Sequence, residues 1–263
     1  MMEDKKKSKA FPTFVLILAI LFIGTGVAVQ FGYLDPVLEQ IGLKEKKQST
    51  KKDGNTNANS NTTIEEGKLD TNSEQVKSLY NRVSNITSKE YSTYYYEQDK
   101  LLTDNMDNKF RLLLAFNTLS KVDNSEISEE EMKNAYANLF GKIEYKGESF
   151  DANCIEYKYD TSKSAYFASS KEVCPSTGCK TKKEEILSAY QYADRVEITT
   201  VVAFSNTCDL KYYKDYKYAN LVLEGSEYSK KLLEENQDKF DHYVYTFALN
   251  EGKYIFTGVS KEV

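Results

Sequence analysis

The chain has 263 residues, a formal net charge of −5 and 21 tyrosines, but no tryptophan and a single histidine. The residues through Lys68 include ten basic and eight acidic side chains, a net of +2, so the remainder carries −7. An acidic remainder argues against nucleic acid as a partner and against electrostatic attachment to anionic lipid.

The first feature along the chain is an uncharged stretch of twenty-five residues, 10–34. A bilayer core ~30 Å thick is spanned by a helix of about 20 apolar residues, so residues 11–34 are predicted to form a transmembrane helix. Four lysines precede it: Lys5, Lys6, Lys7 and Lys9. Because positive charge beside a span stays in the cytoplasm, we expect residues 1–10 to form a cytoplasmic tail and the rest of the chain to lie outside.

The same stretch shares features with three further kinds of N-terminal segment. Gly26-Val27-Ala28 fits the cleavage site of a signal peptide, but the apolar run continues to Leu34, which favours a retained anchor. A lipoprotein needs an early cysteine, and the first cysteine is Cys154. A type IV prepilin would carry a glutamate where this chain has Val15.

Residues 35–70 are predicted to be a juxtamembrane segment followed by a linker. Pro36 suits the first position of a short amphipathic helix over residues 35–41. Residues 44–67 are polar and of low complexity, so they have too little apolar surface to fold. As a flexible coil of about 24 residues, this segment would average roughly 25–30 Å from end to end.

Residues 71–263 are predicted to form one extracytoplasmic domain that begins with helices. Thr71 and Glu74 offer a capping box for the first helix, and a second helix is expected over residues 103–119. In the third helix, Ser128 is the expected N-cap, Glu131 the reciprocal capping residue and Gly141 the terminator. The acidic triplet that opens this helix, Glu129 to Glu131, is interpreted as capping and solvation rather than as a metal or catalytic cluster. The tyrosine run 94–96 fits either a strand or an aromatic turn.

Beyond Gly141 the apolar period changes from helical to alternating. The pattern predicts two hairpins and a long strand, together with a further alternating segment and two short helices. The hairpins are expected at residues 154–160 with 165–168 and at 243–249 with 254–259, the long strand at 195–204, the alternating segment at 211–219, and the helices at 182–192 and 226–235. Helices followed by adjacent strands predict an α+β fold with an antiparallel sheet, by analogy a cystatin-like or NTF2-like roll.

All four cysteines lie in the exported part: Cys154, Cys174, Cys179 and Cys208. An even number in an oxidising compartment predicts two disulfides. The spacing of Cys174 and Cys179 and the distance to His242 argue against a zinc site. Two pairings join Cys154 to Cys174 or to Cys179 and leave the other for Cys208, and these are slightly favoured. The third pairing joins Cys174 to Cys179 across a turn and leaves Cys154 to Cys208.

Three stretches, residues 154–160, 194–200 and 245–247, together with the later cysteines, resemble single-pass membrane-anchored proteins of low-GC Gram-positive bacteria. The resemblance covers most of residues 71–263. It implies an outward-facing anchored domain and carries no activity that transfers to this chain.

The sequence lacks the usual signatures of catalysis. His242 is the only imidazole, and the sequence contains no nucleophile motif for which it could act as the base. We therefore interpret it as a partly exposed strand residue. No phosphate loop, dinucleotide fingerprint, zinc-protease motif or calcium loop is found. No catalytic, cofactor or metal residue is therefore predicted, and the expected cofactor set is empty.

The sequence predicts a non-enzymatic, membrane-anchored protein for binding, sensing or envelope organisation. Its expected partner is an envelope protein or a small ligand, and the tyrosine-rich strands are candidates for a ligand groove. The alternative is an extracytoplasmic hydrolase of the glycosidase type that works through two carboxylates, because 40 acidic residues allow many pairs.

Overall fold

The computed structural model describes residues 65–86, 88, 90–119, 125–152, 154–170 and 178–262. These residues belong to one unit of the chain, which spans residues 61–263. The predicted cytoplasmic tail, transmembrane helix and most of the linker lie outside them. Within the described ranges, no helix has the length and apolar character needed to cross a bilayer.

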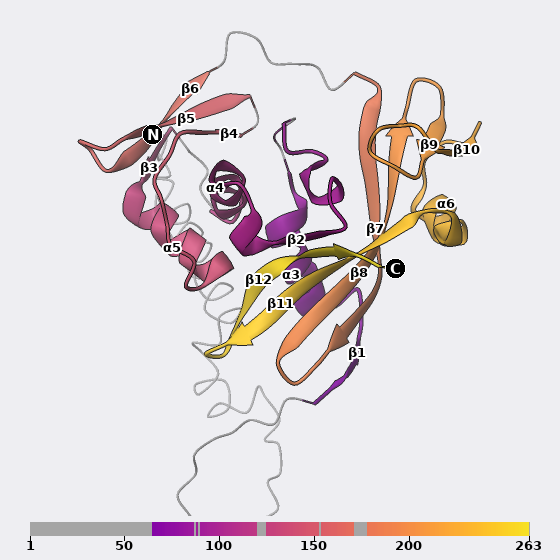
Figure 1. Cartoon of the computed structure of the whole chain (residues 1–263), viewed down its shortest axis with the longest axis horizontal. Coiled ribbons are helices and arrows are strands. Elements are labelled where there is room, and N and C mark those ends of the chain that lie inside the picture. The colour runs from indigo at the N-terminus through magenta and orange to yellow at the C-terminus, as the bar shows by residue number, and fades with distance from the viewer. Residues whose placement is uncertain are drawn as a thin grey trace, which may run out of the picture. The chain divides into compact units, whose positions relative to one another are not determined.

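Antiparallel sheets and a few helices make up this unit, so the predicted α+β class is confirmed (Figure 1). The larger sheet has the strand order β1-β7-β8-β11-β12-β2. In addition, β9 pairs with the C-terminal end of β8, and β10 pairs with β9. Its strands are β1 (Gly67–Leu69), β2 (Lys100–Leu102), β7 (Lys180–Gln191), β8 (Arg195–Asn206), β9 (Lys211–Tyr213), β10 (Leu221–Glu224), β11 (Asp241–Asn250) and β12 (Lys253–Lys261). The smaller sheet has the order β3-β6-β5-β4, with β3 (Glu126–Ser128), β4 (Phe150–Ala152), β5 (Ile155–Asp160) and β6 (Ala165–Ser170).

One of the described helices bridges the two sheets. The helices are α3 (Glu74–Ser84), α4 (Asn108–Asn117), α5 (Glu129–Phe140) and α6 (Lys230–Glu235), with short 3-10 turns η1 (Tyr94–Tyr96), η2 (Thr103–Asn105) and η3 (Gln237–Lys239). Helix α5 contacts β3 of the small sheet and β12 of the large sheet, and α4 packs on α5 and β4 (Figure 1). Helix α6 covers the opposite face of β7 and β8.

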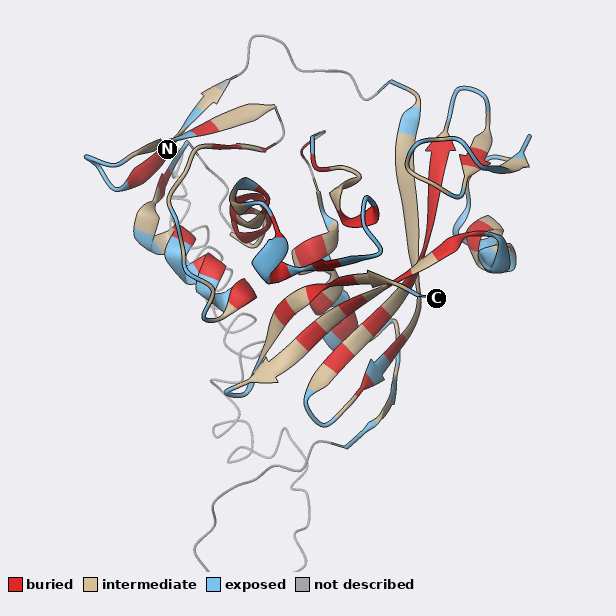
Figure 2. Cartoon of the chain, in the orientation of Figure 1, coloured by how far each residue is buried: buried red, intermediate tan, exposed pale blue. Residues whose placement is uncertain are grey.

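The alternation of apolar residues explains the long strands. On β8, Val196, Ile198, Val202 and Phe204 point to the helical side and are buried, as the period-two pattern predicts. Buried and half-buried residues likewise alternate along β11 (Figure 2). Both predicted hairpins are confirmed, since β5 pairs with β6 and β11 pairs with β12.

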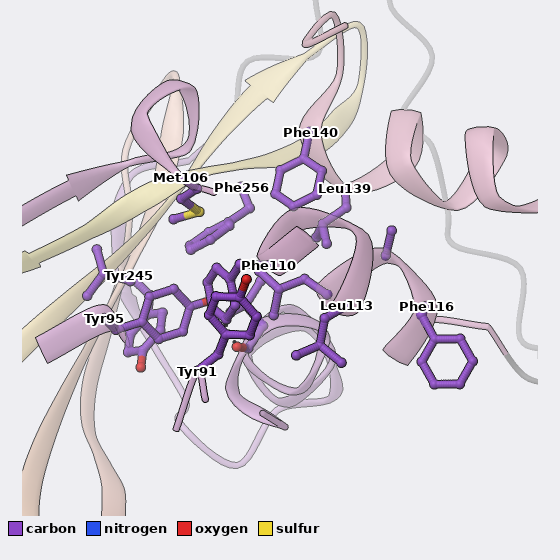
Figure 3. Close-up of a cluster of buried hydrophobic side chains, with 14 of the residues drawn as sticks. Tyr91, Tyr95, Met106, Phe110, Leu113, Phe116, Leu139, Phe140, Tyr245 and Phe256 are labelled. Atoms are coloured by element: carbon purple, nitrogen blue, oxygen red, sulfur yellow. Dashed lines mark hydrogen bonds between the residues drawn. The ribbon is translucent and has the colours of Figure 1, made fainter. Parts of the chain in front are cut away.

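The core between sheet and helices is rich in aromatic rings (Figure 3). Tyr95 of η1 contacts Phe110 of α4, Tyr245 of β11 and Phe256 of β12, in each case edge to face. Its hydroxyl donates a hydrogen bond of 3.0 Å to the backbone carbonyl of Val83. Rings from four segments are thereby packed together while the buried phenol keeps a hydrogen-bond partner.

The helix caps follow the sequence closely. The Ser128 and Glu131 capping box is present, and Gly141 ends α5 with a positive φ of 66°. The first helix starts later than predicted, because Ser73 rather than Thr71 accepts the backbone N–H of Val76. The second is α4, which Asp107 caps, so residues 103–105 form a separate 3-10 turn.

The helix predicted over residues 182–192 is wrong, because this segment is strand β7. Its residues Lys182, Lys183, Glu184 and Glu185 favour helices intrinsically, but β7 pairs with β8 from Lys180 to Gln191. Two charged residues, Lys182 and Glu184, occupy inward positions where apolar residues are expected. Because charged residues replace apolar ones at these positions, the sequence does not show the apolar–polar alternation that is typical of a strand.

Two further boundaries differ from the sequence prediction. The strand expected over residues 211–219 ends at Tyr213, because the carboxylate of Asp215 accepts the N–H groups of Lys217, Ala219 and Asn220 and holds a turn. Strand β1 lies inside the segment expected to be linker. It pairs with β7 only at residues 189–191, so the outer edge of β7 from Lys180 to Ser188 has no strand partner among the described residues.

Gly258 of β12 offers a test of the close approach between β12 and the edge strand β2. It lies at a bulge of β12 with φ of 149°, and an added Cβ would come within 2.5 Å of the Leu101 carbonyl oxygen on β2. We expect Gly258→Ala to lower the free energy of unfolding by about 2–3 kcal/mol, since both the conformation and the contact are unfavourable. Urea denaturation measures this change.

Gly67→Ala is the matched control. Gly67 lies on β1, the strand at the opposite edge of the sheet from β2, and it has no positive φ. No atom lies within 4 Å of an added Cβ there. We expect a change of less than about 0.5 kcal/mol there. Equal losses in the two variants would contradict the close approach at Gly258.

Candidate functional site

The candidate site is built on the charged residues of β7 that face inward. Residues two apart on a strand share a face, so Lys182 and Glu184 project to the same side of the sheet. The register sets Lys182 opposite Phe204 and Glu184 opposite Val202, both on β8. Only 4% of the Glu184 side chain is exposed, against 19% of the Lys182 side chain. The carboxylate is therefore buried, and the lysine connects it to the surface.

Four donors surround the Glu184 carboxylate. Oε1 accepts from Thr200 Oγ1 at 2.8 Å and from the Tyr245 hydroxyl at 2.9 Å. Oε2 accepts from Lys182 Nζ at 2.6 Å and from the Tyr96 hydroxyl at 2.9 Å. Lys182 Nζ also donates to the Tyr96 oxygen at 2.9 Å. The two carboxylate oxygens have about four lone-pair directions between them, and all are occupied.

This environment sets the protonation states. Burial by itself would raise the pKa of Glu184, but the charge of Lys182 and the hydrogen bonds from Lys182, Thr200 and Tyr245 outweigh it, so the pKa is lowered. Burial, and next the Glu184 charge, raise the pKa of the Tyr96 and Tyr245 hydroxyls well above the ordinary value. At neutral pH Glu184 is therefore a carboxylate, and Tyr96 and Tyr245 are neutral phenols that donate to it.

Beside this network lies a cavity of about 460 Å³, which we call the lysine pocket. It opens between Ile86, Ser92 and Thr93 and the adjoining ends of β7 and β8. Its lining combines ammonium groups, hydroxyls and apolar surface: Ile86, Ser92, Thr93, Lys180, Thr181, Lys182, Phe204 and Tyr218. Lys180 Nζ lies 4.4 Å from the centre of the Tyr218 ring, and Lys182 Nζ lies 5.2 Å from that of Tyr96. Both charges are thus held against aromatic faces.

A disulfide secures the end of the pocket. Cys179, directly before Lys180, is bonded to Cys208 in the turn after β8, with 5.3 Å between the Cα atoms. Thr207 reinforces the junction, because its N–H and its hydroxyl both donate to the Cys179 carbonyl. The bond fits one of the two favoured pairings and rules out the local pairing of Cys174 with Cys179. Cys154 is also disulfide-bonded, and the prediction for Cys174 falls outside the described residues.

A second, more open hollow of about 660 Å³ lies where α3, α5 and β12 meet. Its most basic group, Arg82, donates to the backbone carbonyls of Tyr254 and Asn138 and thereby joins these elements. Its carboxylate, Glu131, belongs to the helix cap. Because these charged groups already serve the fold, this hollow is a weaker candidate than the lysine pocket.

The residues that the sequence analysis considered for chemistry lie elsewhere. His242 is half-buried on β11, with Nδ1 3.1 Å from a Glu262 carboxylate oxygen and Nε2 3.0 Å from the Gln237 carbonyl oxygen. Glu129 pairs with Lys133 one turn along the helix. Within the described ranges, no three histidine, cysteine or acidic side chains cluster as metal ligands would. Sequence reasoning missed Lys182 and Glu184 because it assigned them to a short helix over residues 182–192 rather than to a strand. The available indication of a strand was an alternating pattern in which charged residues occupy the inward positions.

Comparisons of the chain with family models, with curated proteins and with solved structures give no match.

The ion pair makes a direct prediction for stability. Lys182→Met leaves the Glu184 carboxylate buried without its cation, and we expect the free energy of unfolding to fall by about 3 kcal/mol. The double variant Lys182→Met/Glu184→Gln removes both charges and should recover at least half of that loss. Urea denaturation of the two variants and the wild type gives the comparison.

The same three proteins test the lowered pKa of Glu184. A carboxylate whose pKa is lowered on folding contributes stability above its unfolded pKa of about 4.3 and loses that contribution as the pH falls through its folded pKa. The neighbouring phenols stay neutral throughout this range. Wild type should therefore lose more stability below about pH 4 than the double variant, and identical acid slopes would contradict the assignment.

Proposed function

We propose that this chain is a membrane-anchored, extracytoplasmic binding protein that holds a small ligand in the lysine pocket and performs no catalysis. A role in sensing or envelope organisation follows from such binding. The observation that carries the proposal is the ordering of Lys182 at the pocket wall. A buried carboxylate and an aromatic ring fix its position, and the pocket itself contributes a second lysine and apolar surface.

This arrangement favours binding over hydrolysis. A glycosidase needs two carboxyl groups facing one bond, one of them with a raised pKa. The described lining of the lysine pocket includes no carboxylate, and the nearest acid, Glu184, has a lowered pKa and a filled set of hydrogen bonds. A pocket volume of about 460 Å³ lies within the ~300–1,000 Å³ range of small-molecule sites.

The wider architecture is part of the proposal. We assign the outer domain to the cystatin-like or NTF2-like rolls, which the packing of helix α3 against an antiparallel sheet supports. The span at residues 11–34 anchors it, and the polar linker holds it away from the bilayer. The disulfides support an oxidising compartment outside the cytoplasm.

The anchoring proposal predicts a definite protease pattern. When protease is added outside intact cells that express the full chain, it should remove the outer domain and leave a membrane-bound fragment that contains residues 1–34. The same treatment of inverted membrane vesicles should leave the outer domain intact. A soluble form that begins near Val29 would instead establish a cleaved signal peptide.

Ligand binding predicts local changes in the spectrum of the full chain. We expect a saturable small molecule to shift the backbone amide signals of Ile86, Ser92 and Thr93 and to leave those of the open hollow at Arg82 unchanged. A library of neutral, anionic and cationic compounds supplies the test. The same library should include aryl glycosides, and turnover of any of them would contradict the non-enzymatic role. Absence of any saturable shift at the pocket would contradict ligand binding.

A further inference from the structure

We infer that the ligand of the lysine pocket is a small organic acid: a single carboxylate on a flat, apolar body. The inference rests on the proposed function, because it names the class of ligand for the same pocket. Two features of the lining carry it, the arrangement of ammonium groups and the position of the aromatic rings.

The anionic head is the first requirement. Lys180 and Lys182 are two residues apart on β7, so they share a face and lie about 7 Å apart along the strand. Of the three N–H groups on Lys182, Glu184 and Tyr96 take two, and no acceptor is seen for the third among the described residues. Lys180 holds its ammonium group over the Tyr218 ring, 4.4 Å from the ring centre. One carboxylate between the two ammonium groups would accept from both.

The apolar body is the second requirement. Phe204 and Tyr218 pack edge to face with their ring centres 6.1 Å apart, and Ile86 adds aliphatic surface from the opposite wall. Apolar walls of this kind bury a flat ring or chain. The hydroxyls of Ser92 and Thr93 lie at the same wall as Ile86, and Thr93 is already bonded to Glu97. Few polar groups therefore remain for a heavily hydroxylated ligand such as a sugar.

Other ligand classes fit this lining less well. A cation would meet two lysines with no acid in the described lining to receive it. A phosphate prefers several converging donors, such as the fork of an arginine or consecutive backbone N–H groups. The Lys182 charge is largely balanced by Glu184, so the pocket's net attraction suits one negative charge better than two.

Two naphthalene probes separate charge from shape. We expect 2-naphthoate to bind the full chain with one-to-one stoichiometry by calorimetry and to shift the signals of Ile86, Ser92 and Thr93. The neutral isostere 2-naphthamide should bind about ten-fold more weakly, because it loses the charge-assisted hydrogen bonds. Inorganic phosphate should not displace naphthoate at equal concentration.

Matched variants then locate the head and the body. Lys180→Gln should weaken naphthoate about five-fold or more and leave naphthamide unchanged. Lys183→Gln is the control, because Lys183 lies on the opposite face of β7 over the Tyr228 ring and carries the same charge. Tyr218→Asn should weaken both probes alike, since asparagine tolerates the positive φ of 60° but removes the ring.

The outcomes distinguish the inference from the function on which it rests. Equal binding of the acid and the amide, or equal effects of the Lys180 and Lys183 variants, would overturn the acid class and leave ligand binding intact. If only a compound of another class shifts the amide signals of the pocket residues, the acid class is likewise overturned and ligand binding stands. If no compound shifts them, the proposed function fails as well.

Discussion

The ion pair between Glu184 and Lys182 is the interaction on which the site depends. Its carboxylate collects hydrogen bonds from three other segments: Thr200 on β8, Tyr245 on β11 and Tyr96 in η1. A charge buried to this extent is tolerated only when each oxygen is satisfied. The requirement therefore ties the position of η1 to two central strands, and it fixes the lysine that faces the pocket.

Tyrosine is the residue that lets an aromatic core and a polar network occupy the same space. The rings of Tyr95 and Tyr96 pack edge to face against phenylalanines, and Tyr95 does the same against Tyr245. The hydroxyl of Tyr95 reaches the carbonyl of Val83, and those of Tyr96 and Tyr245 reach the carboxylate of Glu184. Tryptophan has no counterpart to the phenol's combined donor and acceptor, so it would leave part of such a network unpaired. The many tyrosines of the chain thus serve packing and hydrogen bonding together.

The sequence was informative wherever local rules decide the structure. The cap at Ser128 and Glu131, the alternation along β8 and the hairpin of β11 and β12 follow from short-range patterns, and all three were predicted. Strand β7 was not, because its lysines and glutamates favour helix and only pairing with β8 makes them a strand. The site escaped prediction for the same reason. Partners of Glu184 lie 16, 61 and 88 residues away in the chain, and no local pattern brings them together.

The outer edge of β7 bears on whether copies of this chain aggregate at high concentration. A long strand with one unpaired side is a template on which another strand can add and begin aggregation. Within the described residues, β1 covers only the last three positions of that edge. Lys182 and Glu184 point inward next to it, and an incoming strand would have to place its own side chains against a fixed ion pair. Inward-pointing charge is one of the features that discourage edge-to-edge pairing of sheets, and here the same two residues order the pocket.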